Sequence, residues 1–299
     1  MGEFSHLVET SGDGLPVSDY RQHTLQKLAT VRYYLEAFNI ACTRTKWFGG
    51  WTFVDTFAGS GLVQVRDTQR FFEGSALIGL RSGASVVHAI EFEQANVDAL
   101  RQRATDRGIG GRLQTHPGDA NTVAPRILAN IRPRTPVFVL QDPESMELKW
   151  STVEAVARAN QGRRKRKPEQ LINFTDGVLR LFWTKQRIAP ANQDRLDSYF
   201  GTGAWRDIVE SRRAGRLESW GTIQAAVDLY KKRLRDDVGY SHVLDQEVRR
   251  DMVTRGQRAY HLIFASDHPA ARGIMTDAFG KVHVGQGQFP GMPPASTDE

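Results

Sequence analysis

Residues 52–61, Thr-Phe-Val-Asp-Thr-Phe-Ala-Gly-Ser-Gly, decide the fold of this chain. An apolar run typical of a β-strand leads directly into Asp55, and a turn containing Gly59 and Gly61 follows. Glycine lets the backbone turn sharply and approach a ligand closely, and the free amides of a following helix can face an acidic group. The stretch therefore indicates a parallel sheet that binds a nucleotide-like ligand.

The position of the acid narrows the choice of ligand. A dinucleotide site has three glycines and places its acid about 20 residues beyond them. Here Gly59 and Gly61 lack a third glycine at the required offset, and Glu91 comes later than that spacing. The insertion at 62–74 also separates the glycines from the next helix, so no phosphate cradle is expected. An acid before the glycines instead suits the cationic amino-acid end of S-adenosylmethionine.

Strand-like and helix-like segments alternate along most of the chain. A helix over about 19–44 is expected to lie against the sheet, because its apolar residues recur at helical spacing. Alternating strands and helices predict an α/β fold with a doubly wound, mostly parallel Rossmann-like sheet. The expected strands are 52–56, 86–90, 112–116, 137–141, 170–174 and 260–265. One expected helix starts at 75, and three others cover 94–107, 122–131 and 151–160.

We expect one methyltransferase-like domain over residues 19–284, with a helical insert at about 185–238 after the fifth strand. Residues 1–18 and 285–299 carry several glycines or prolines and few large apolar groups. Such segments bury too little apolar surface to fold, so both are predicted to be disordered tails.

Composition excludes several classes of protein. Hydrophobic residues make up 40% of the 299 residues, which is enough for a full core. The single cysteine, Cys42, rules out a disulfide framework and a cysteine-rich metal site. There is no apolar run of the ~20 residues needed to span a bilayer, and no export signal at the N-terminus. The expected protein is cytoplasmic, without a metal and without membrane contact.

A basic run raises the question of a polyanionic partner. The net charge is +6, which by itself is a weak argument for nucleic acid. Such a run either stays solvated on a loop or is neutralised by phosphates of DNA or RNA. The run consists of Arg163, Arg164, Lys165, Arg166 and Lys167.

Acids stand at the ends of four successive predicted strands: Asp55, Glu91, Asp119 and Asp142. Ligands of open parallel sheets bind at the carboxyl ends of the strands. In S-adenosylmethionine, the ribose hydroxyls suit Glu91, the adenine amine suits Asp119 and the ammonium group suits Asp55. Taken singly, each acid could instead be a helix N-cap or a turn residue, and for Asp119 this is the commoner role.

Other enzyme chemistries find little support in the sequence. There is no Gly-x-Ser-x-Gly, no lysine after a phosphate-binding glycine loop and no closely spaced histidine pair. Methyl transfer needs fewer catalytic groups, because the sulfonium is already a strong electrophile. The protein must mainly align the acceptor and exclude water.

Several motifs resemble those of the three-Cys-motif partner proteins (TcmP), a branch of the Rossmann-like S-adenosylmethionine-dependent methyltransferases. The similarity extends from about residue 25 to about residue 285. The motifs that carry it are Tyr34-Leu35-Glu36-Ala37-Phe38, Val54-Asp55-Thr56-Phe57-Ala58-Gly59-Ser60-Gly61, Glu73-Gly74-Ser75-Ala76-Leu77, Arg195-Leu196-Asp197, Phe200-Gly201-Thr202, Trp205-Arg206 and Tyr260-His261-Leu262-Ile263-Phe264-Ala265-Ser266-Asp267-His268-Pro269.

The resemblance implies a partner protein that bears a three-cysteine motif, and acceptor chemistry at Asp142 and Glu144. It also implies a cofactor site formed by Asp55, Phe57, Gly59, Gly61, Glu91 and Asp119.

The acceptor is not given by the resemblance. Related enzymes that methylate base amines carry Asp/Asn-Pro-Pro-Tyr after the fourth strand, where the acid grips the amine and the aromatic ring stacks on a flipped base. This chain has Asp142-Pro143-Glu144-Ser145 instead. Nucleic acid is the leading expectation for the acceptor, with protein or small molecules as alternatives. A different class of function also stays open: a non-catalytic partner that associates with a cysteine-motif protein.

Overall fold

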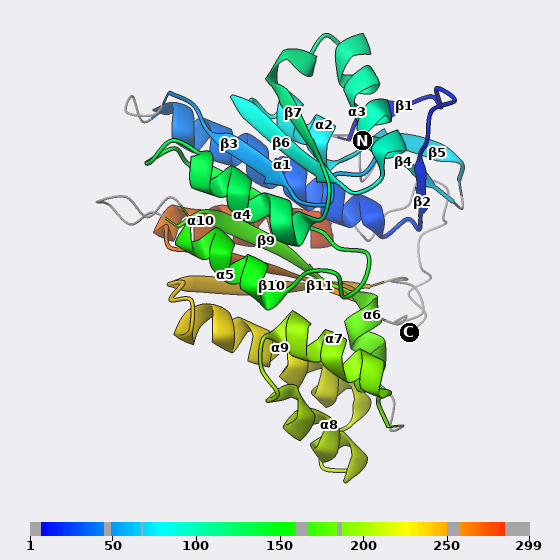
Figure 1. Ribbon diagram of the computed structural model, residues 1–299, viewed down its shortest axis with the longest axis vertical. Coiled ribbons are helices and arrows are strands. Elements are labelled where there is room, and N and C mark those ends of the chain that lie inside the picture. The colour runs from blue at the N-terminus through cyan, green and yellow to red at the C-terminus, as the bar shows by residue number, and fades with distance from the viewer. Residues whose placement is uncertain are drawn as a thin grey trace, which may run out of the picture.

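The computed structural model describes residues 7–44, 49–66, 68–159, 167–183, 187–249 and 258–284. Its centre is a seven-stranded sheet with helices on both faces (Figure 1). The strands of this sheet are β3 (Thr52–Asp55), β6 (Val86–Glu91), β7 (Leu113–Pro117), β8 (Val137–Gln141), β9 (Glu169–Phe174), β10 (His242–Arg249) and β11 (Arg258–Ser266).

The order of strands across the sheet is β10-β11-β9-β8-β3-β6-β7. Strands β3, β6, β7, β8 and β9 are parallel, whereas β11 pairs antiparallel with β9 and with β10. The chain winds outward from β3 in both directions, so the order reverses between β3 and β8. Ligands of such sheets bind beside this reversal, at the carboxyl ends of the strands. The predicted doubly wound, mostly parallel α/β fold is confirmed.

One face of the sheet is covered by the first and last helices. Apolar side chains of β3, β8 and β11, among them Phe53, Phe138 and Phe264, pack against these helices in one large core. The helices on this face are α1 (Thr24–Arg44), α2 (Ser75–Arg81), α3 (Gln94–Asp106), which precedes the short 3-10 helix η1 (Gly110–Arg112), and α10 (Pro269–Val284).

The opposite face has two separate cores. Helices α4 (Ala120–Asn130) and α5 (Trp150–Arg158) pack on Val54, Ile90 and Val139. A helical insert after β9 packs on Ile172 and Ile263, and lies at the lower end of the molecule in Figure 1. It consists of α6 (Asp176–Trp183), α7 (Pro190–Phe200), α8 (Trp205–Arg213) and α9 (Ser219–Asp236). Within the described residues, no helix has the length and apolar content that a membrane crossing requires.

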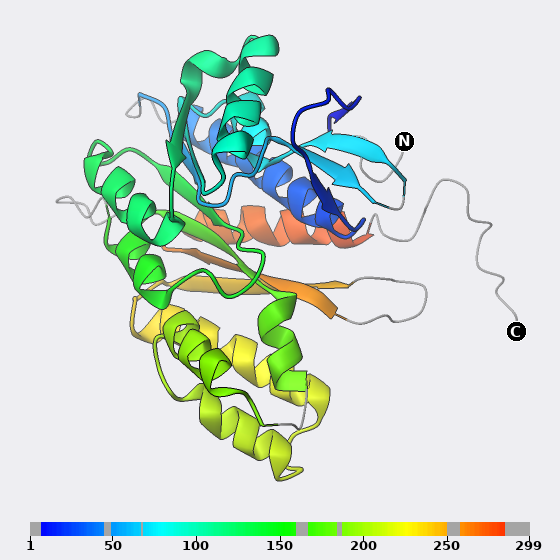
Figure 2. The same cartoon turned by 45° about the vertical axis from the view of Figure 1, so that its right-hand side comes forward.

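A second, four-stranded sheet has the order β1-β5-β4-β2. Its strands are β1 (Glu9–Thr10), β2 (Ser18–Tyr20), β4 (Leu62–Val65) and β5 (Arg70–Glu73). The unusual insertion after Gly61 therefore forms a hairpin that pairs with the N-terminal segment. Figure 2 shows this sheet close to the start of α1.

The N-terminal segment differs from the prediction of a disordered tail over 1–18. Residues 7–18 include β1 and the start of β2, while residues 1–6 lie outside the described part. Arg103 of α3 holds the segment. Its side chain is 1% exposed, and its guanidinium donates to both carboxylate oxygens of Asp13 and to the carbonyl of Pro16. The tail predicted over 285–299 also lies outside the described residues.

Candidate cofactor and acceptor site

The acids predicted at the strand ends share one edge of the main sheet. In the β3–β6 register Asp55 faces Ala89, two residues before Glu91, and in the β3–β8 register it faces Leu140, two residues before Asp142. Parallel strands end at the same edge, so Asp55, Glu91 and Asp142 lie along it on both sides of the point where the strand order reverses.

The glycine turn after β3 is tied to the next strand. The amide of Ala58 donates to the carbonyl of Ile90 at 2.9 Å, and the amide of Gly59 donates to Glu91 Oε2 at 2.9 Å. Gly59 has φ +60°, and a Cβ there would meet nothing within 4 Å. The turn therefore leaves open space beside the Glu91 carboxylate.

Gly61 has a packing role. Its φ is +89°, and a Cβ there would come within 2.7 Å of Leu100 Cδ1. Its carbonyl accepts a hydrogen bond of 2.8 Å from the amide of Gly74, just before α2. Gly61 thus allows α3 to pack against the turn, whereas Gly59 keeps the space above the turn free.

Glu91 is partly exposed at the end of β6. Its other carboxylate oxygen, Oε1, accepts a hydrogen bond of 2.9 Å from the amide of Glu93. The intervening Phe92 is 72% exposed, which is unusual for a phenylalanine. Phe92 was not among the predicted site residues; the signal for it in the sequence is an aromatic residue directly after the acid at a strand end. A flat apolar ring here offers a stacking surface next to the carboxylate.

Asp55 is completely buried. Its carboxylate accepts a long hydrogen bond of 3.4 Å from the amide of Phe57, and Oδ2 has no hydrogen-bond partner. Burial raises the pKa of Asp55 to about 7, the polar side chain of Ser75 opposes this shift, and the negative charge of Asp142 adds to it. A buried oxygen without a partner is costly, so this carboxyl suits a cationic or hydrogen-bond-donating group.

Phe57 and Asp119 are the remaining predicted cofactor residues. Phe57 is partly buried and packs against the two cores on the α4–α5 face. Asp119 is exposed at the end of β7 and caps α4, where its side chain accepts from the amide of Asn121 at 3.0 Å. The structure therefore gives Asp119 the N-cap role that was the alternative, at the same edge of the sheet.

Asp142 lines a cavity of about 340 Å³ on the other side of the reversal. It forms an ion pair with Lys27 of α1 and accepts a hydrogen bond of 2.8 Å from Asn173 Nδ2 at the end of β9. Glu144 lines the same cavity and accepts a hydrogen bond of 3.0 Å from the hydroxyl of Tyr20 in β2. Both candidate catalytic acids are thus held by residues from the N-terminal part of the chain.

The residues that hold these acids were not among the predicted site residues. Lys27 is only 8% exposed and stands between Leu25 and Leu28, both buried. A lysine within an apolar helical run is a weak signal, because the long side chain usually reaches solvent. Nothing in the local sequence of Tyr20 or Asn173 marks a site residue.

The basic run lies mostly outside the described residues, which include only Lys167 of its five members. Lys167 Nζ donates to the carbonyl of Gly239 at 2.7 Å and to Asp267 Oδ2 at 3.0 Å. It precedes β9 and so lies at the amino ends of the strands, away from the acids. Among the described residues no group of three or more His, Cys, Asp or Glu side chains is placed to hold a metal ion.

Comparisons with known proteins concern the fold. No protein-family model and no curated protein matches the sequence. Among solved structures, protein LPL1258 from Legionella pneumophila is similar over 86% of this chain and 92% of its own, at 9% identity and a TM-score of 0.51.

Methyltransferase structures also stand among the similar structures. The METTL16 methyltransferase domain matches over 85% of this chain and 74% of its own, at 10% identity and a TM-score of 0.46. The O-methyltransferase TomG from Streptomyces achromogenes was solved in complex with S-adenosylmethionine. It matches over 82% of this chain and 80% of its own, at 13% identity and a TM-score of 0.41. The likeness to LPL1258 shows a shared fold, and the two weaker likenesses add no argument to it.

Proposed function

We propose that this protein is an S-adenosylmethionine-dependent methyltransferase whose cofactor binds where the strand order reverses. One arrangement carries the proposal: Glu91 holds the amide of Gly59 beside open space, and the buried Asp55 on the neighbouring strand has an oxygen without a partner. The two carboxyls suit two polar groups of the cofactor, its ribose hydroxyls and its ammonium group. The residues therefore fit the group.

Each residue of the site has a task in this proposal. Glu91 accepts hydrogen bonds from the ribose hydroxyls, Phe92 stacks on the adenine ring, and Asp119 accepts from the adenine amine. Asp55 faces the ammonium group, which supplies the donor that Oδ2 lacks. When bound, the cofactor supplies an electrophilic methyl group on its sulfonium, and the protein has to align the acceptor with it.

The acceptor binds in the cavity of about 340 Å³ lined by Asp142 and Glu144. Asp142, fixed between Lys27 and Asn173, orients the acceptor by accepting a hydrogen bond from it. Glu144 is placed to take the proton that the acceptor loses. We assign the acceptor to nucleic acid, because an acid after the fourth strand can grip a base amine.

Two measurements test the proposal. Calorimetry should detect binding of S-adenosylmethionine, and transfer of a labelled methyl group should be seen on DNA or RNA and not on protein. Asp142→Asn should reduce transfer at least tenfold and leave cofactor affinity within about twofold, since Asp142 acts on the acceptor. Absence of cofactor binding would refute the proposal, and transfer to protein alone would refute the assignment of the acceptor.

A second candidate function is a non-catalytic member of the three-Cys-motif partner family that works by association. The observation in its favour is that both candidate catalytic acids are already engaged, Asp142 by Lys27 and Glu144 by Tyr20. This role predicts stable binding to a three-cysteine-motif protein and no methyl transfer even in its presence. Label transfer measured with and without that partner separates the two functions.

A further inference from the structure

A second cavity, of about 1000 Å³, lies along β6, β7 and α4. It extends from Gly49 and Gly50, before β3, to Pro117 at the end of β7. The residues that line it do not include Asp55, Glu91 or Asp142. It is therefore a separate site, and the proposed function does not use it.

The floor of this groove is polar where a doubly wound sheet is normally apolar. In the strand registers His88 faces Val54, Gln114 faces His88, and His116 faces Ile90. Residues opposite each other share a face, so these three polar side chains lie on the face where Val54 and Ile90 pack under α4 and α5. Strands covered on both faces are mostly apolar, as in the fully buried β8, where four of five residues are apolar. The polar side chains therefore mark a part of the sheet that none of the described helices covers fully.

The walls of the groove are cationic. Arg126, Arg132 and Arg134 line it and are exposed, and none of the described residues that line it is an aspartate or a glutamate. Arg126 and Arg132 form no ion pair with a described carboxylate. Arginine guanidinium groups recognise phosphate through paired hydrogen bonds.

The two histidines of the floor contribute hydrogen bonds and no charge. His88 Nδ1 and His116 Nε2 are 3.0 Å apart, so one ring donates to the other. Burial lowers the pKa of both imidazoles, and the neighbouring ring lowers the pKa of His88 further, to about 4. Neutral rings, together with Gln114, add hydrogen-bonding groups between the arginines.

We propose that this groove binds the sugar-phosphate backbone of a single nucleic-acid strand. An open, elongated cavity whose described lining has three arginines and no carboxylate suits a chain of phosphates better than one compact anion. Among the described residues that line it there is no phenylalanine or tyrosine, and Trp51 is only 1% exposed, so we assign the contacts to phosphates and sugars. The proposal does not depend on methyl transfer.

The test measures binding of a fluorescent oligothymidylate to the full chain by anisotropy over a series of salt concentrations, without cofactor. The triple variant Arg126→Gln/Arg132→Gln/Arg134→Gln should bind at least tenfold more weakly at low salt. Because each phosphate contact contributes about 0.7 to the slope of log affinity against log salt, the slope should become shallower by about 2. Gln114→Glu, which adds a negative charge to the exposed floor, should weaken binding without removing an arginine.

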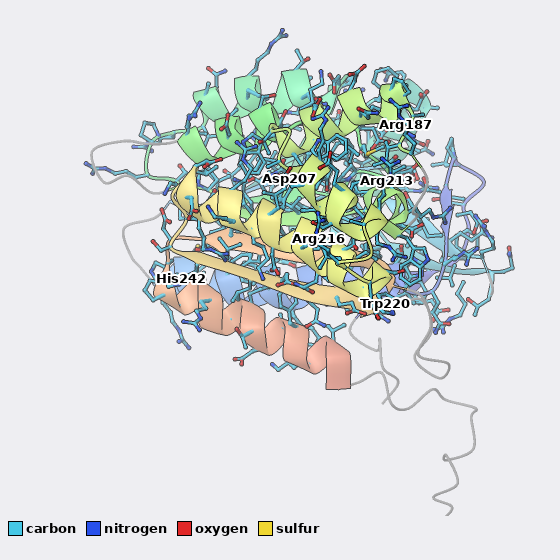
Figure 3. The ribbon with its side chains drawn as sticks, turned by 90° about the horizontal axis from the view of Figure 1, so that it is seen from below. Arg187, Asp207, Arg213, Arg216, Trp220 and His242 are labelled. Atoms are coloured by element: carbon cyan, nitrogen blue, oxygen red, sulfur yellow. The ribbon has the colours of Figure 1, made fainter. Side chains whose placement is uncertain are left out.

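The matched control removes the same charge elsewhere. Arg187, Arg213 and Arg216 are exposed on the helical insert, away from the groove, and are labelled in Figure 3. Their triple Gln variant should keep the affinity and the slope of the native chain. An equal loss of affinity in both triple variants would show diffuse electrostatic attraction and overturn the proposal. The proposal would also be overturned if the native protein did not bind the oligonucleotide, or if inorganic phosphate competed as effectively as unlabelled oligonucleotide. Calorimetry with S-adenosylmethionine on the same variants reports on the cofactor site separately.

Discussion

The amide of Gly59 donates a hydrogen bond of 2.9 Å to the carboxylate of Glu91, which lies 32 residues further along the chain. This bond joins the turn after β3 to the end of β6 and fixes the position of the carboxylate at the edge of the sheet. Because Glu91 is partly exposed while its second oxygen is held by the amide of Glu93, the side chain is oriented before any ligand arrives. Such preorganisation lowers the entropic cost of binding.

Glu91→Ala is expected to weaken binding of S-adenosylmethionine by about 100-fold or more, because two ribose hydroxyls lose a charged acceptor and each such bond is worth about 1.5–3 kcal/mol. Isothermal calorimetry measures the change. Asp98→Ala on α3, an exposed acid that contacts Gln94, is the matched control and should bind as the native chain does. An unchanged dissociation constant for Glu91→Ala would show that the carboxylate does not contact the cofactor.

The two glycines of the turn should respond differently to alanine. Gly61→Ala combines positive φ with a close approach to Leu100. We therefore expect it to lower the free energy of unfolding by about 2–4 kcal/mol, as measured by thermal unfolding. Gly59→Ala faces open space and should cost only about 1 kcal/mol, yet lower cofactor affinity at least tenfold by filling that space. Gly108→Ala, with φ +67° and no neighbour within 4 Å, has the same backbone cost away from the site and should leave affinity intact. If Gly59→Ala and Gly108→Ala bind cofactor equally well, the space beside Gly59 is not the cofactor site.

The ion pair between Lys27 and Asp142 should be strongly coupled, because both side chains are at most 15% exposed. Removal of one partner leaves a buried, unpaired charge. Lys27→Met and Asp142→Asn are therefore each expected to lower the free energy of unfolding by about 2–4 kcal/mol, as measured by urea unfolding. The double variant should lose less than the sum by more than about 1 kcal/mol. The same double-mutant cycle on Arg32 and Glu36, a pair on α1 that is more exposed than Lys27 and Asp142, should give a coupling energy below about 0.5 kcal/mol. If the losses of stability from Lys27→Met and Asp142→Asn were additive, the two side chains would not be energetically coupled.

Asp55 should make the free protein less stable as pH rises. Its pKa is about 7 in the folded protein and about 3.8 in the unfolded chain, so between these values the folded state binds more protons and stability falls with increasing pH. Asp55→Asn lacks this penalty. Its stability relative to the native chain should therefore increase by about 2–4 kcal/mol from pH 4.5 to pH 8, as measured by urea unfolding.

Glu169, whose pKa burial also raises to about 7, contributes in the same direction to both proteins and cancels in this comparison. Parallel stability curves for the native chain and Asp55→Asn would mean that Asp55 does not titrate in this range. Saturating S-adenosylmethionine should reduce the pH dependence of the native chain, because its ammonium group would favour the ionised carboxylate.

The strands that were predicted well are those with a strong local signal. Strand β8 has four consecutive apolar residues, 137–140, before Gln141, and was predicted with the bounds that it has. Strand β10 was missed because His242, Asp245, Gln246, Glu247 and Arg249 interrupt its apolar pattern. An edge strand pairs on one side only and tolerates such polar residues.

The sequence by itself determined the alternation of strands and helices, the glycine turn and the placement of acids at strand ends, because these depend on local periodicity and on the backbone freedom of glycine. Only the tertiary structure decided which residues surround those acids. Residues 24–31 of α1 are all buried, so Lys27 points to Asp142 instead of solvent. The second sheet brings Tyr20 to Glu144, and a partly covered face of β6 and β7 leaves a groove lined by arginines. Each of these arrangements joins segments far apart in the chain, and no local pattern encodes such contacts.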